Sequence, residues 1–409
     1  VMKYKVIDGK KEIKARLTVR GFKDMESDTL QTFAGTATRW GQRMVCSVAA
    51  QYGWELWSAD VSMAFLRGLT FKEIAKLSDT PVRAIQFDLP PGANIILRLF
   101  SGFQDFDHVQ ETLDMTKPGI GTKDAPWAWG LELSATLHDY GWRPTKADAR
   151  FFVLHSWFVP KPLLAHLDVP PPETQADSQL LAVCSTHVDD LKGASIAKLR
   201  EHFFAVLEGK YDKLKVQLRN FECVGVRHTQ AEDYTVTMDQ DEYAKQLRPI
   251  DTTPIKFLKD DEKVPLFITG LLQSLLGALS WMVLTRVDIC VFVNRLQRNQ
   301  KDPSMKDVKD VNKLMRWVQR QSSVTTYARM VPPLCITVLS DAAYRADDED
   351  CLALRAAVAV LIEVRDGVPG GTMHLLDFYS RKQTRVNRIT FSAELNALLE
   401  ATDLGIVLC

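Results

Sequence analysis

Hydrophobic and polar residues alternate along the chain with two different spacings, one typical of helices and one typical of strands. Apolar residues recur every three or four positions in segments 36–52, 122–142, 195–208 and 240–248, and less regularly through 265–320, which predicts helices. Short apolar or alternating runs bounded by turn residues predict strands in segments 3–23, 53–60, 180–186, 214–238, 332–344 and 356–364. Segment 3–23 divides into two strands at an Asp-Gly turn.

Two stretches lack either spacing and predict irregular structure. Residues 69–96 contain prolines and a Leu-Pro-Pro-Gly turn, and residues 158–178 form a proline-rich segment that leads into the strand at 180–186. Charged residues become more frequent near 301–330, which predicts a domain boundary there. The interspersed strands and helices together indicate a protein of mixed α+β class.

Several features indicate where such a chain resides. The most apolar window, 271–293, contains Arg286 and Asp288, so it predicts a buried helix rather than a membrane span. The seven cysteines form no Cys-x-x-Cys pair, which favours a reducing compartment and argues against structural zinc. No signal peptide stands at the start, and the chain begins and stops without caps, so we expect it to be a piece of a longer polypeptide.

The overall charge is balanced, with 51 basic and 51 acidic residues, but its distribution is uneven. Residues 1–23 carry a local net charge of +6, and residues 294–320 carry eight basic residues against three acidic ones. Both segments fit phosphate-facing surfaces, and both equally fit solvated faces of ordinary secondary structure. Charge alone does not decide between these two interpretations.

Candidate chemistry comes from aspartates placed at strand ends. Asp60 ends the predicted strand at 53–60, and Asp189 and Asp190 follow the strand at 180–186. Mg²⁺ prefers oxygen ligands and needs one or two carboxylates when phosphates and water complete its shell. Two such ions about 4 Å apart support in-line displacement at phosphorus. Because strand side chains alternate, we expect Asp189 to be the main ligand and Asp190 an accessory one; a solvated Asp-Asp turn is the competing interpretation.

A resemblance to copia-type retrotransposon polyproteins favours the metal interpretation. The segment ADVSMAFLRG resembles the family's D-V-x-x-A-F-L-x-G block, and HVDD resembles its Y-V-D-D block. Further blocks occur in the family's order: KARLTVRGF, TFAGTA, LPPG, GTKDAPWAW, FECVGV, LLGALSWMVLTRVDICVFVNRLQ, LSDAAYRADDED and SAELNALLEAT. Each block alone is a modest signal, but their common order over nearly the whole chain is specific.

The resemblance implies a reverse transcriptase of right-hand architecture followed by the start of an RNase H domain. Fingers and palm are expected in residues 1–215, thumb and connection in 216–330, and a partial RNase H-like α/β domain in 331–409. The palm is expected to be an antiparallel sheet with helices on one face, which would bring Asp60 beside the hairpin that carries Asp189 and Asp190.

The resemblance also implies roles for individual residues. Asp60, Asp189 and Asp190 match the polymerase carboxylates that hold two Mg²⁺ ions, with Mn²⁺ as an alternative, and the Val61 carbonyl would assist them. Phe65 matches the aromatic gate that excludes a 2′-hydroxyl, although its spacing also fits a core residue. The remaining matches concern the incoming nucleotide and the primer end: Lys14, Arg16, Arg20, Gly121 and Lys123 for the nucleotide, and His187 for the primer.

The chain departs from the family pattern at several positions. His187 stands where tyrosine is usual, and Asp124 and Trp127 stand where glutamine and arginine are usual. Asp341 and Glu394 match the first two RNase H carboxylates, but the sequence stops before the third. We therefore expect little or no RNase H activity from this chain.

The partners follow from the same resemblance: an RNA template, a DNA primer and product, deoxynucleoside triphosphates and other parts of the polyprotein, but no membrane. The expected location is cytoplasmic, in virus-like particles, or nuclear, and not secreted. The principal hypothesis is an RNA-directed DNA polymerase. The alternative is a non-catalytic or degenerate retrotransposon remnant that folds and binds nucleic acid without polymerising.

Overall fold

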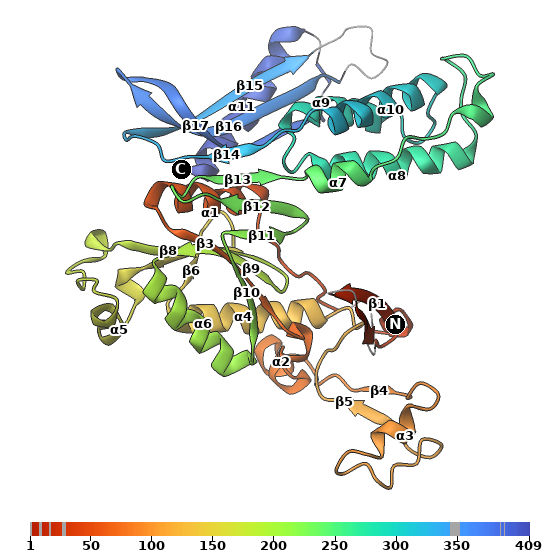
Figure 1. Ribbon diagram of the computed structural model, residues 1–409, viewed down its shortest axis with the longest axis vertical. Helices are drawn as coiled ribbons and strands as arrows, with labels where there is room; N and C mark the ends of the chain where they lie inside the picture. The colour runs from red at the N-terminus through yellow and green to blue at the C-terminus, as the bar shows by residue number, and fades with distance from the viewer. Residues whose placement is uncertain are drawn as a thin grey trace.

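The computed structural model describes residues 2–7, 10–15, 18–26, 30–343, 352–384, 386–387 and 389–409. Helices and strands are interspersed throughout this part of the chain, as the α+β prediction requires. Figure 1 shows a central sheet with the N-terminal hairpin and a small β4–β5 arm on one side of it, and a second group of sheets and helices on the other. Among these residues, no helix combines the length and apolar composition that a membrane crossing needs.

The central sheet is antiparallel and has six strands in the order β10-β3-β9-β8-β7-β6. Their bounds are β3 Glu55–Val61, β6 Arg143–Pro144, β7 Phe151–His155, β8 Leu180–His187, β9 Asp190–Ser195 and β10 Leu214–Leu218. The boundary expected at residue 215 therefore falls inside a strand of this sheet. Strand β3 coincides closely with the alternating segment 53–60 that predicted it.

Helices cover both faces of the central sheet, and not one face as expected, because β3 directs apolar side chains to both faces. On one face, Trp57 and Ala59 pack with α4 (Ala125–Tyr140) and α6 (Ala197–Tyr211). On the other, Leu56 packs with α1 (Arg39–Tyr52). Helix α4 begins with a proline in its first turn, as predicted, and ends at Gly141, whose φ of 115° is the left-handed conformation that favours glycine.

Two segments expected to be irregular contain helices. Residues 69–96 include α2 (Phe71–Ser78) and all but the last residue of α3 (Ala93–Leu97), so this prediction was wrong in part. Helix α2 begins with a capping box, in which Thr70 and Glu73 each bind the other's backbone amide. The proline-rich segment likewise contains α5 (Lys161–His166). Two hairpins complete this half, formed by β1 (Met2–Ile7) with β2 (Lys10–Ala15) and by β4 (Ile85–Phe87) with β5 (Leu113–Met115).

A second sheet and a group of helices follow the central sheet. Strands β11 (Asn220–Cys223), β12 (Val226–Gln230), β13 (Val236–Asp239) and β14 (Thr325–Tyr327) form the sheet. The helices are α7 (Asp241–Gln246), α8 (Leu266–Met282), α9 (Cys290–Arg298) and α10 (Met305–Arg320). The four helices share one hydrophobic core. This part confirms the predicted helical character of 265–320.

The C-terminal part contains a three-stranded antiparallel sheet with a helix against it. The strands are β15 (Leu334–Ala343), β16 (Leu354–Arg365) and β17 (Val368–Lys382), and the helix is α11 (Thr390–Leu408). Strand β17 contacts α1 of the central sheet, where the Arg39 guanidinium pairs with Asp377 and lies over the Phe378 ring. The C-terminal sheet is therefore docked on the α1 side of the central sheet (Figure 1).

Candidate active site

The aspartates singled out from the sequence meet at one edge of the central sheet. Asp60 on β3 is the direct cross-strand partner of Asp190 on β9, and Asp190 is in turn the partner of His187 on β8. On the other side, Asp60 pairs with Lys215 on β10. Directly paired residues of antiparallel strands lie on the same face. The register therefore places four polar side chains in a row across four strands, and Lys215 is the member that the sequence did not reveal.

Asp189 lies outside this row, in the turn between β8 and β9. The turn consists of Val188 and Asp189, and Val188 adopts a φ of 58°. A positive φ is a rare, strained conformation for a β-branched residue, and such strain persists only where neighbours enforce it. Here the buried Trp129 indole donates a hydrogen bond of 2.9 Å to the Val188 carbonyl, which fixes the turn from α4.

The electrostatics of the row reflect like charges held together. Partial burial, followed by the charges of Asp189 and Asp60, raises the pKa of Asp190 to about 6, and Lys215 offsets this only in part. Partial burial lowers the pKa of His187, with Asp189 acting in the opposite direction. Opposed like charges across a strand pair destabilise a sheet. This edge therefore concentrates negative charge that a bound cation would neutralise.

The donor set fits a hard divalent cation, but only with help from other ligands. Asp60 on β3, Asp190 on β9 and Asp189 in the β8–β9 turn supply carboxylate oxygens. Within the described residues, no three or more His, Cys, Asp or Glu side chains already form a metal-binding group. Mg²⁺ tolerates such a partial set because water and substrate phosphates complete its octahedron. The register puts Asp190 opposite Asp60, whereas the ranking of Asp189 above Asp190 stays a prediction.

A buried lysine lies two residues beyond Asp190 on the same face of β9. Lys192 is 1% exposed, and its ammonium group lies 3.2 Å from Nε2 of the buried His228. Burial and then the charge of Lys192 lower the pKa of His228 well below its usual value, so the ring is neutral. Its Nδ1–H donates to the Val226 carbonyl and its Nε2 accepts from Lys192. The chain thus holds a cation beneath the carboxylates, which the sequence analysis missed.

Val61 and Phe65 lie just beyond Asp60. Val61 is the last residue of β3 and is buried, while Phe65 belongs to a short 3₁₀ turn, Ala64–Leu66. Phe65 is half-buried and packs against the core that contains Trp57 and Val61. Phe65 therefore serves in part as a core residue, as its spacing in the sequence allowed, and the rest of its side chain is accessible to solvent.

The segments carrying the other predicted nucleotide contacts cross each other closely. The Val19 amide donates to the Ile120 carbonyl at 2.9 Å, and a Cβ on Gly21 would lie 2.1 Å from the Gly121 carbonyl oxygen. Only glycine fits this crossing, since Gly121 itself has a φ of 103°. Arg20 therefore lies beside Gly121, and both it and Lys123 are exposed. Lys14 falls on β2, and Arg16 lies outside the described residues.

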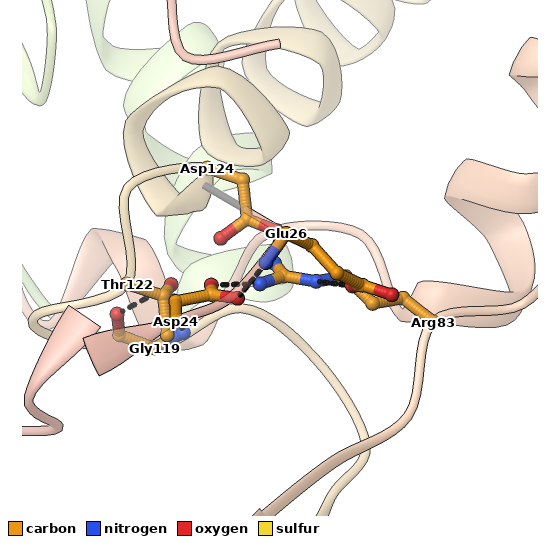
Figure 2. A network of polar contacts seen from close by, with 6 residues as sticks. All are labelled: Asp24, Glu26, Arg83, Gly119, Thr122 and Asp124. Carbon is orange, nitrogen blue, oxygen red and sulfur yellow. Dashed lines mark hydrogen bonds and ion pairs between the residues drawn. The ribbon is translucent and has the colours of Figure 1, made fainter. Parts of the chain in front are cut away.

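One guanidinium fastens this crossing to the start of α4. Figure 2 shows Arg83 between Asp24, Glu26 and Asp124, all of which it contacts as ion pairs. The side chains of Arg83 and Asp124 are 10% and 6% exposed, so this is a buried pair. A hollow of about 760 Å³ lies alongside, between segments 18–26 and 84–91. Asp124, one of the departures from the family pattern, thus has a dedicated partner in Arg83.

The two RNase H-like residues lie on neighbouring elements but face differently. Ala342 packs with Ala393 between β15 and α11. Because side chains alternate along β15, its neighbour Asp341 points to the face away from α11 and is exposed. Glu394 is half-buried on α11 itself. The structure therefore does not bring Asp341 and Glu394 together in the way that it brings Asp60 and Asp190 together.

Comparison with known proteins gives two relatives from Arabidopsis thaliana. The chain is 23% identical over 394 residues to the retrovirus-related Pol polyprotein from transposon RE1, and 24% identical over 390 residues to that from transposon RE2. Each match covers 94% of this chain and 24% of the relative, so the chain spans about a quarter of their length. No family model and no solved structure matches the chain. The resemblance to a retrotransposon polyprotein is confirmed.

Proposed function

We propose that this chain, a relative of retrotransposon Pol polyproteins, is the reverse transcriptase region of such a polyprotein and extends DNA primers on RNA templates. The observation that carries the proposal is the register of the central sheet, which places Asp60 opposite Asp190 with Asp189 in the adjoining turn. The order of the sequence blocks supports the same assignment. Right-hand architecture is part of the proposal, with the central sheet as palm, the N-terminal segments as fingers and helices α7–α10 as thumb and connection.

The aspartates would hold two Mg²⁺ ions, or Mn²⁺ in their place, which when bound would activate the primer hydroxyl and neutralise the leaving pyrophosphate. The protein's own contribution is to hold three carboxylates together despite their repulsion. The turn fixed by Trp129 positions Asp189, and the paired strands position Asp60 and Asp190. The carbonyl of Val61, the last residue of β3, would assist them.

The remaining residues would bind and select the nucleotide. Arg20 and Lys123 are exposed cations next to Gly21 and near Gly121 in the chain, and they would supply counter-charge to a triphosphate. The accessible part of Phe65 would lie against the sugar and exclude a 2′-hydroxyl. The half-buried ring of His187 would contact the primer end. A chain with these roles would act in virus-like particles of the cytoplasm, or in the nucleus, with other parts of the polyprotein as partners.

Primer extension on an RNA template with Mg²⁺ tests the proposal. The comparison includes wild type, Asp189→Asn and the control Asp139→Asn. Asp139 is an exposed aspartate near the end of α4, so its substitution removes the same charge at a position away from the site. We expect extension by wild type and Asp139→Asn. We expect a loss of at least about 100-fold in Asp189→Asn, since replacing even an outer-shell partner of a metal ligand costs about 10- to 100-fold. Equal activity in all three would refute the assignment of Asp189 to the active site, and no activity in any of them would favour the non-catalytic alternative.

A further inference from the structure

A groove between α9 and α10 combines positive charge with exposed aromatic rings. Both helices belong to the group of elements on the opposite side of the central sheet from the N-terminal hairpin (Figure 1). Its volume is about 710 Å³, and its floor is formed by the buried Leu296 and Leu314. The side chains that matter for recognition are Phe292, Arg295, Lys313, Arg316, Trp317 and Arg320. Residues 313, 316, 317 and 320 follow helical spacing along one face of α10.

The four basic residues of the groove are available for a ligand. Arg295, Lys313, Arg316 and Arg320 are all exposed. Nowhere in the part of the chain that the structure describes does any of them take part in an ion pair or a side-chain hydrogen bond. The half-buried Asp310 is the one acidic residue lining the groove. The groove therefore carries a local excess of positive charge on a protein whose basic and acidic residues balance overall, and that excess attracts an anionic partner.

The aromatic residue at the centre is held rigidly from beneath. The Trp317 side chain is 40% exposed, and the guanidinium of the buried Arg286 lies 5.0 Å from its ring centroid. Arg286 is itself fixed, because it donates to Asp288 at 3.0 Å and to the Gln321 carbonyl at 2.7 Å. Phe292 across the groove is 51% exposed. A rigid ring with accessible surface loses little conformational entropy when a flat ligand stacks on it.

We propose that this groove binds single-stranded nucleic acid, with a base stacked on Trp317 and adjacent phosphates on the α10 cations. Residues 313 to 320 span ~10 Å of helix at about 1.5 Å per residue, room for more than one phosphate contact. A duplex offers phosphates but keeps its base faces stacked, and an acidic peptide offers charge without flat rings. Only an unpaired strand uses both the cations and the aromatic surface. The site is separate from the carboxylate row and does not require polymerase activity.

Fluorescence anisotropy with a labelled 12-nucleotide RNA or DNA strand tests the groove, using the whole chain in EDTA so that metal-dependent binding is absent. Trp317→Ala should weaken binding about 5- to 150-fold, the range for one stacked base. Trp317→Phe, which keeps a ring, should lose less than about 3-fold. Trp157→Ala, at a 44% exposed tryptophan elsewhere, should bind like wild type.

The charge contribution has its own matched pair of variants. Arg316→Ala/Arg320→Ala should lower the slope of log K against log salt by about 1.4, since each phosphate contact on a single strand contributes about 0.7. Lys72→Ala/Lys76→Ala removes two charges at the same i, i+4 spacing on α2 and should leave the slope unchanged. These exposed positions leave the core intact, so the test stands even if Trp317→Ala fails to fold.

Competition identifies the occupant. An unlabelled single strand should displace the probe at least 10-fold better than a duplex of the same sequence or an oligoglutamate of the same charge. Equal displacement by the duplex, equal displacement by the oligoglutamate, or unchanged affinity in both groove variants would each overturn the proposal. Asp189→Asn should bind the strand like wild type, which separates this result from the fate of the polymerase proposal.

Discussion

Replacing Arg83 by methionine should destabilise the protein strongly, because one guanidinium compensates three carboxylates in a mostly buried position. Its partners are Asp24, Glu26 and Asp124, whose side chains are 15%, 61% and 6% exposed. Solvent screens Glu26 but not Asp124, and Oδ1 of Asp124 already has no hydrogen-bond partner in the described residues. Removing one partner of a buried ion pair costs about 3–5 kcal/mol of unfolding free energy. Because Asp124 is the most deeply buried of the three partners and Glu26 is screened by solvent, we expect Arg83→Met to cost about 3 kcal/mol, near the lower end of that range.

A double-mutant cycle separates the charge pair from the packing of the arginine stem. Asp124→Asn alone should cost about 1 kcal/mol, because Arg83 keeps two carboxylates. In Arg83→Met/Asp124→Asn the unpaired buried charge is gone, so the total should fall short of the sum of the single variants by about 2 kcal/mol. Urea unfolding with a common m-value measures all four proteins.

The control for this cycle is another arginine–aspartate pair at the surface. Arg67 pairs with Asp212, and their side chains are 31% and 74% exposed. Arg67→Met should cost less than about 1 kcal/mol, the usual limit for an exposed pair. A loss at Arg83 no larger than at Arg67, or additive effects within the cycle, would refute the account of Arg83 as the fastening of the N-terminal segment to α4.

Two further predictions concern the carboxylate row. Asp190 has a pKa of about 6 in the folded protein against an ordinary value of 3.8, so the folded state binds its proton more tightly. Its contribution to stability is then present below about pH 4 and lost as pH rises through 6. Asp190→Asn should therefore be about 1–2 kcal/mol more stable than wild type at pH 7 in EDTA, allowing for solvent screening of a half-exposed group. The stability difference between Asp190→Asn and wild type should vanish near pH 4. Urea unfolding at both pH values measures it, and a variant less stable than wild type at pH 7 would contradict the prediction. Phe65→Ala should raise ribonucleotide incorporation in primer extension relative to deoxynucleotide; unchanged discrimination would assign the ring to the core alone.

Much of the fold could be predicted because its signals are local. Alternation in β3 and helical spacing in α1 and α4 each lie within one element, and the structure contains these elements close to the predicted bounds. Helix α2 was missed although Thr70 and Glu73 show the capping-box spacing, because the prolines farther along suggested an irregular segment. Prolines that lie beyond the end of a helix do not prevent it from forming, whereas a capping box stabilises its start.

The site could be predicted only in part because its geometry depends on strand register. The sequence indicated that Asp60 and the Asp189–Asp190 pair would meet, but the residue directly opposite Asp60 is set by the pairing of β3 with β9, which are far apart in the sequence. The two-residue turn at 188–189 sets only the pairing of β8 with β9. Lys215 and Lys192 give no sequence signal, since each is one lysine in an ordinary strand. The partnership of Arg83 with Asp124 spans 41 positions and depends on tertiary structure alone.

Three unfavourable features coincide at the end of the central sheet, and their coincidence argues for function. Asp60 and Asp190 oppose like charges, Val188 holds a strained backbone, and Lys192 is a buried cation whose hydrogen-bond partner is a neutral histidine. Each alone lowers stability. A sheet edge with a purely structural role would be more stable with apolar residues and a glycine in the turn. Stability given up at one point by independent means is typical of a functional site, and the three carboxylates are the feature that supports the proposed divalent cation there.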